Sequence, residues 1–117
     1  MRLEFEDVEL ERLAYDVGAS TKRWPPDVTR AYRRRIQQIA AANDDRDLRA
    51  VKSLHLEKLR GDRAGTHSIR INQKYRLIVR FTTTPTGRTT VIVDGLELAR
   101  DRRNLNLRGL LHLRELG

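Results

Sequence analysis

The sequence contains no cysteine, and this absence excludes several kinds of site. Without a thiol there is no disulfide framework, no thiolate metal ligand and no cysteine nucleophile. The three histidines, His55, His67 and His112, lie too far apart in the chain to form a local metal-binding motif. We therefore expect a protein that works without a metal or another cofactor.

Long hydrophobic runs are also missing. No apolar stretch approaches the roughly 20 residues that a membrane-spanning helix needs, and no signal-like apolar segment follows Met1. We expect a cytoplasmic protein that has no membrane partner.

Aromatic residues are scarce and make up 5% of the chain. Proteins that bind single-stranded RNA in general stack its bases on exposed aromatic side chains. Most of the aromatic residues here fall on faces that are otherwise apolar, which leaves few for such a platform. The composition therefore disfavours a general RNA-binding protein.

Positive charge is abundant and unevenly distributed. The formal net charge is +8, and residues 52–88 hold nine Lys/Arg against two Asp/Glu. Residues 1–51 balance ten basic residues against ten acidic ones. A concentrated basic region on a small protein indicates a polyanion partner, with nucleic acid the first candidate. The alternative is a basic surface that serves solubility alone.

The hydrophobic pattern of the 117 residues predicts one α+β domain. A short strand over 2–5 precedes helical patterns over 7–17, over 25–43 and over 45–51. From residue 55 onward the apolar period changes from 3.6 to 2, which predicts strands over 56–60, 66–71, 75–82 and 88–94. We expect the N-terminal helices to pack on one face of a small antiparallel β-sheet.

Alternation within the predicted strands separates two faces of the sheet. Leu77 and Val79 point to one side, together with Tyr75 and Phe81, and we expect this side to face the helices. Arg70, Arg76 and Arg80 then line the exposed side, within reach of one another. An outer sheet face that carries charge only to remain solvated is the alternative interpretation.

Residues 56–81 carry the most specific motif of the chain. They read LEKLRGDRAGTHSIRINQKYRLIVRF, and this stretch resembles the HigB branch of the RelE/ParE toxin superfamily. That family follows the approximate pattern L-x-K-L-x-G-D-x-x-G-x-x-S-I-R-V-N-x-x-Y-R-I-x-F. The resemblance covers about residues 5–94, so we assign 1–96 to a RelE/HigB-like toxin domain and 97–117 to a tail rich in Leu and Arg.

The resemblance implies a toxin of a type II toxin–antitoxin system. Toxins of this kind are ribosome-dependent, metal-free mRNA endoribonucleases (mRNA interferases) that inhibit translation. The implied partners are a HigA-like helix-turn-helix antitoxin, the ribosome and mRNA, and both a homodimer and a toxin–antitoxin hetero-oligomer stay open. The alternative is a ParE-like toxin of the same fold, which binds and inhibits gyrase without cleaving RNA.

The matched motif also implies roles for single residues. Arg70 and Arg76 correspond to arginines that hold the scissile phosphate and its transition state, and Lys58 corresponds to a lysine that stabilises charge or moves a proton. His55 is a candidate for acid/base work, with an ordinary exposed loop histidine as the alternative. We expect the remaining basic residues of this region to bind RNA or the ribosome: Arg60, Arg63, Lys74 and Arg80.

The last predicted strand departs from the family. Relatives commonly end it with Asp-Tyr-His, whereas this chain reads Asp94-Gly95-Leu96 and so lacks two groups suited to acid/base chemistry. His67 falls on the apolar side of its strand, where packing is the expected role. The tail is open to three interpretations: a cap on the domain, a dimer contact, or a segment that orders on the antitoxin.

Overall fold

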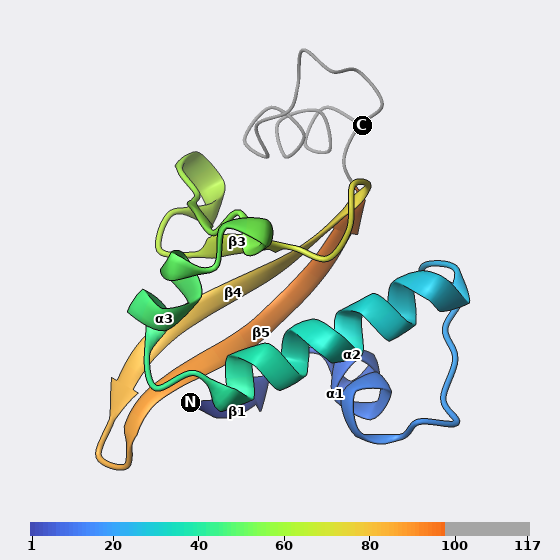
Figure 1. Ribbon diagram of the computed structural model, residues 1–117, viewed down its shortest axis with the longest axis horizontal. Coiled ribbons are helices and arrows are strands. Elements are labelled where there is room, and N and C mark those ends of the chain that lie inside the picture. Colours follow the sequence, from blue (N-terminus) through green and yellow to red (C-terminus); the bar gives the residue numbers. More distant parts are fainter. Residues whose placement is uncertain (98–117) are drawn as a thin grey trace.

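A computed structural model describes residues 1–97, and the predicted tail lies outside the described residues except for Glu97. Figure 1 shows a long twisted hairpin of two strands, with the helices gathered beside it. The elements, in chain order, are β1 (Arg2–Phe5), α1 (Val8–Tyr15), α2 (Pro26–Ala41), α3 (Asp45–Ala50), the 3-10 turn η1 (Lys52–Leu54), β2 (Glu57–Lys58), the 3-10 turn η2 (Gly61–Arg63), β3 (His67–Arg70), β4 (Tyr75–Thr84) and β5 (Gly87–Glu97).

The α+β prediction is confirmed, but the sheet is mixed and not purely antiparallel. Its strand order is β1-β5-β4-β3-β2. All neighbours pair antiparallel except β1, which runs parallel to β5 and pairs Leu3 with Thr90. A parallel pair needs a long crossover between its strands, and everything from α1 to β4 lies between β1 and β5 in the chain.

Strand lengths differ from the prediction at the β2 edge and in the interior of the sheet. β2 has two residues in place of the five expected over 56–60, while β4 and β5 have 10 and 11. The pairing of β4 with β5 shifts between Ile78 and Val79, so that Val93 is an extra residue on β5. Such a bulge adds local twist and bends the strand.

Local sequence explains where the two longer helices begin. Asp7 caps α1, because its side chain accepts a hydrogen bond from the backbone N–H of Leu10 at 3.0 Å. Pro26 opens α2, where a missing N–H costs nothing. No helix within residues 1–97 is both long enough and apolar enough to cross a membrane.

The main core lies between the helices and one face of the sheet. Tyr32 and Leu10 are fully buried there, and the Tyr32 hydroxyl donates to the carbonyl oxygen of Leu10 at 2.7 Å. The sheet contributes Ile69, Leu77 and Val79, as the alternation predicts. Because this core covers one face of β3 and β4, a functional site on these strands has to lie on the opposite face.

The opposite, outer face carries a second and smaller apolar cluster. Leu59, Ile78 and Leu96 are buried together there, with Val93 packed against them. Ile78 lies between Arg76 and Arg80 on β4, on the side that alternation predicts to be exposed, but it is buried because Leu59 and Leu96 pack against it. Part of the outer face is therefore buried by apolar side chains.

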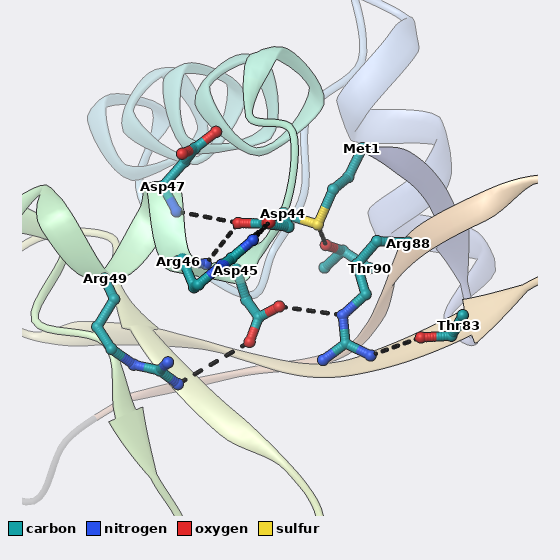
Figure 2. A network of polar contacts seen from close by, with 9 residues as sticks. All are labelled: Met1, Asp44, Asp45, Arg46, Asp47, Arg49, Thr83, Arg88 and Thr90. Atoms are coloured by element: carbon teal, nitrogen blue, oxygen red, sulfur yellow. Dashed lines mark hydrogen bonds and ion pairs between the residues drawn. The ribbon is translucent and has the colours of Figure 1, made fainter.

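A polar network fastens α3 to the hairpin of β4 and β5 (Figure 2). Asp45 accepts a hydrogen bond from Arg88 Nε at 3.0 Å and lies 3.9 Å from Arg49. Arg88 also donates to the Thr83 hydroxyl at 3.0 Å. Asp44 caps the helix through the backbone N–H of Arg46. A helix of six residues is too short to be stable alone, and these contacts help to stabilise it.

Candidate functional site

Two arginines face each other across neighbouring strands on the outer face. Arg70 of β3 is paired in register with Arg76 of β4. Directly opposed residues project to the same side of a sheet, and like charges in this position repel. Within residues 1–97 the carboxylate at salt-bridge distance from this pair is that of Glu57, 3.9 Å from Arg76. In the described part of the chain the pair is therefore under-neutralised.

Arg76 is held in place by neutral oxygen atoms. Its Nη2 donates to the carbonyl oxygen of His55 at 2.6 Å and to the hydroxyl of Ser68 at 2.8 Å. The residue is only 5% exposed, and its Nε, like that of Arg70, has no acceptor in the described part of the chain. Burial lowers the pKa of Arg76 to about 10; Arg70 also lowers it, while Glu57 raises it. The guanidinium stays charged at neutral pH.

The prediction that Arg76 lies on an exposed face is wrong, because Ser68 and the turn at His55 enclose it. His55 follows η1 with φ 46° and ψ 51°, a left-handed conformation that non-glycine residues seldom adopt. Its carbonyl oxygen turns toward Arg76, while its side chain is exposed. The structure thus joins His55 to Arg76 through the backbone.

Two neighbours of Arg76 escaped the sequence reasoning. Ser68 is fully buried, and Glu57 lies opposite it on β2. A signal for Ser68 was present, since alternation places it on the same side of β3 as Arg70. No comparable signal pointed to Glu57, because β2 is too short to show a period.

Lys58 projects from the other side of β2. It is paired in register with His67, whose ring packs on Phe81 at 5.1 Å between centroids on the helix side of the sheet. His67 is half-buried, as its predicted packing role requires, and burial lowers its pKa, with Arg49 contributing in the same direction. The structure does not bring Lys58 to the face of Arg76.

The other basic candidates are spread over the surface. Arg80 lies four residues beyond Arg76 on β4, about 13 Å along the strand, and forms an ion pair with Glu6. Arg63 lies 3.5 Å from Asp94. Arg60 and Lys74 are exposed. Arg70 and Arg76 are therefore together, and Arg80 is separate from them.

The structure gives a physical reason for the glycine in Asp94-Gly95-Leu96. A Cβ atom on Gly95 would lie 2.6 Å from the ring of Trp24, so the indole fills the space that a side chain would need. Leu96 is paired with Arg76 on the outer face and is buried beside Ile78. An apolar side chain, not a titratable one, therefore borders Arg76 here.

Fold and site together define a small α+β protein with an under-neutralised arginine pair on the outer face of its sheet. Residues 3–94 match the family of RelE-like toxins of the type II toxin–antitoxin system HigB. The chain therefore belongs to the HigB-like toxins, and membership of a toxin–antitoxin system implies an antitoxin partner.

The chain is also similar to individual proteins. The chain is 35% identical over 81 residues to Toxin HigB-1 of Vibrio cholerae serotype O1, covering 69% of this chain and 84% of the relative. It is 31% identical over 80 residues to an uncharacterized protein of Haemophilus influenzae, covering 68% and 78%. Among solved structures it is similar to a YoeB/ParE toxin from Agrobacterium tumefaciens, with a TM-score of 0.48, 16% identity and coverage of 85% of this chain and 100% of that chain.

Proposed function

We propose that this HigB-like toxin is a ribosome-dependent mRNA endoribonuclease that works without a metal and inhibits translation. The observation that carries the proposal is the Arg70–Arg76 pair, in which two guanidinium groups share one side of the sheet and, among residues 1–97, have one carboxylate within salt-bridge distance, at 3.9 Å. A bound anion would relieve their repulsion. Guanidinium forks match phosphate oxygens and keep their charge.

The chemistry would use the substrate's own ribose. The 2′-oxygen attacks the adjacent phosphorus, a 2′,3′-cyclic phosphate forms, and the bond from phosphorus to the 5′-oxygen breaks. Negative charge grows on the phosphoryl oxygens during this step, so fixed cations lower its barrier. Arg76 suits this role because its cradle of Ser68 and the His55 carbonyl holds the guanidinium before substrate arrives.

The reaction also needs two proton transfers. The 2′-hydroxyl must lose a proton and the 5′-oxygen must gain one. His55 is our candidate for one transfer, since its turn is tied to Arg76 and its side chain is exposed. Lys58, opposite His67, would contribute only if RNA passes over the edge strand β2.

The partners follow the same proposal. Exposed Arg60 and Lys74 would bind phosphates of ribosomal RNA, which needs no sequence readout. Arg63 and Arg80 would add to this surface after release from Asp94 and Glu6. We propose a HigA-like helix-turn-helix protein as the antitoxin.

Substitution of Arg70 tests the proposal against a matched control. Arg70→Gln removes one charge of the pair, and Arg12→Gln removes an exposed charge from α1, beside β1 at the far edge of the sheet from β3. We expect Arg70→Gln to cut a translated reporter mRNA on the order of 10² to 10³-fold more slowly than wild type, and Arg12→Gln to cut within a few-fold. Both variants should keep the wild-type circular dichroism spectrum and bind the antitoxin.

Arg76→Ala should abolish cleavage as well, with folding checked in the same way because this side chain is buried. Full activity of a folded Arg70→Gln protein would remove the arginine pair from the mechanism. Growth arrest with intact mRNA and altered DNA supercoiling would favour the ParE-like alternative, inhibition of gyrase.

A further inference from the structure

The arginines of α2 have no part in the site described so far. Arg33 has a structural role, because its guanidinium donates to the carbonyl oxygens of Leu13 at 2.7 Å, Asp16 at 2.8 Å and Ala19 at 3.1 Å. These contacts satisfy carbonyl groups at and beyond the end of α1. Arg35 differs, because it points to the sheet and not to α1.

Arg35 reaches the end of β3. Its Nε donates to the backbone carbonyl oxygen of Arg70 at 2.7 Å, and its Nη1 donates to the Gln38 side chain at 2.8 Å. Burial lowers the pKa of Arg35, and the neighbouring charges of Arg34 and Arg70 lower it further. Within residues 1–97 no carboxylate lies at salt-bridge distance from Arg34, Arg35 or Arg70.

Four arginines thus follow one another from the outer face to α2, and we call them the arginine row: Arg76, Arg70, Arg35 and Arg34. Register pairs Arg76 with Arg70, and Arg35 donates to the backbone carbonyl oxygen of Arg70, not to its side chain. The charges of both Arg34 and Arg70 act on the Arg35 guanidinium. Glu57, next to Arg76, is the one carboxylate at salt-bridge distance from any of them in the described region. One phosphate cannot neutralise the whole row.

We propose that Arg34 and Arg35 form a second phosphate subsite, which binds the RNA phosphate next to the one held by Arg70 and Arg76. The inference rests on the RNA substrate of the proposed function. A single RNA strand presents consecutive negative charges along its backbone, so it can contact several cations of the row at once. An isolated anion cannot. Guanidinium groups bind such phosphates without reading the base.

Oligonucleotide length separates the two subsites. The probes are a dinucleotide with one phosphodiester and a hexanucleotide, both 2′-O-methylated so that they cannot be cleaved, titrated at low salt by NMR and by fluorescence anisotropy. Arg70→Gln should weaken both probes. Arg34→Gln should leave the dinucleotide unchanged, weaken the hexanucleotide several-fold, and reduce its slope of log K against log salt by about 0.7, the value of one phosphate contact to a single strand.

Arg12→Gln is the matched control, since Arg12 is an exposed arginine of α1 beside β1, at the far edge of the sheet from β3. Arg34 is exposed too, so its substitution does not endanger folding. Equal hexanucleotide affinity of Arg34→Gln and Arg12→Gln, or no binding of the hexanucleotide by wild type, would overturn the second subsite.

Cleavage of a translated reporter, measured in parallel, keeps this inference apart from the proposed function. If the wild-type protein cleaves the reporter and Arg34→Gln does not change hexanucleotide binding, the subsite is rejected and the nuclease is retained. Hexanucleotide binding that depends on Arg34, without any cleavage, would retain the subsite and reject the nuclease.

Discussion

At the scale of single residues, the indole of Trp24 fills the space that a side chain at position 95 would need. The indole of Trp24 is 4% exposed, donates to the Thr29 hydroxyl at 2.8 Å and lies where a side chain on Gly95 would stand. The tyrosine common at this point in relatives would have no room. The glycine is thus explained by packing, and the missing Tyr says nothing about the outer face, which position 95 does not reach.

Substitution of Gly95 should therefore act on stability. Gly95→Ala places a Cβ against a buried ring, so we expect a loss of about 1–3 kcal/mol in the free energy of unfolding, measured by urea denaturation. Gly18→Ala, whose Cβ would meet the Asp16 carboxylate at 3.4 Å, should change stability by no more than about 0.5 kcal/mol. Equal effects of the two substitutions would contradict the packing account.

His67 makes stability depend on pH. Burial lowers its pKa below the ordinary value of 6.5, because it removes water from the charged imidazole, and the nearby charge of Arg49 lowers the pKa further. The folded protein therefore prefers the neutral form. This stabilisation is complete above the pKa of the unfolded chain and is lost as the pH falls through the lower pKa of the folded one.

We expect wild type to lose stability between pH 7.5 and pH 5, with His67→Leu losing measurably less over the same range. Urea denaturation at the two pH values provides the comparison. An identical loss in both proteins would show that His67 is not the group that titrates.

At the scale of elements, α3 depends on the contact that Figure 2 shows. The Asp45 side chain is 17% exposed and joins the helix to Arg88 at the start of β5. Asp45→Asn removes the charge of this contact, so we expect a loss of about 1 kcal/mol and faster amide hydrogen exchange in α3. Arg46→Gln breaks a pair in which Arg46 is 84% exposed, and it should change neither quantity.

Slow exchange throughout α3 in the Asp45→Asn protein would contradict this dependence. It would mean that Leu48, which is 2% exposed, holds the helix on its apolar contacts alone.

The sequence predicted some elements well and others poorly, for definite reasons. Alternation assigned the faces of β3 and β4, and the short connection over 72–74 brings Arg70 opposite Arg76. The phase of β2 could not be read from two residues, and a one-residue difference turns a side chain to the other face. The family motif groups Lys58 with the arginines but carries no information on the phase of the strand, and the pairing of β2 places Lys58 beside His67.

The cradle of Arg76 could not be predicted at all. His55 lies 21 positions before Arg76 and contributes a backbone oxygen, which leaves no mark in the sequence. The reach of Arg35 to the Arg70 carbonyl was equally hidden, since α2 and β3 are separated by 35 positions between these residues.

At the scale of the whole molecule, charge and fold act together. The net charge is +8, and the excess lies mainly in residues 52–88, which contain β2, β3 and β4. The first element pair is acidic by contrast: Glu4, Glu6, Asp7, Glu9 and Glu11 lie on β1, α1 and the residues between them. The two edges of the sheet therefore differ in charge, and the edge formed by β2 and β3 is the one suited to RNA.

The most direct test of the central claim is primer-extension mapping of a reporter mRNA in a reconstituted translation system, with and without ribosomes. The account predicts that antitoxin-free wild-type protein produces cuts within the translated region and none when ribosomes are left out. A folded protein that leaves the translated message intact, or cuts it equally without ribosomes, would contradict the account.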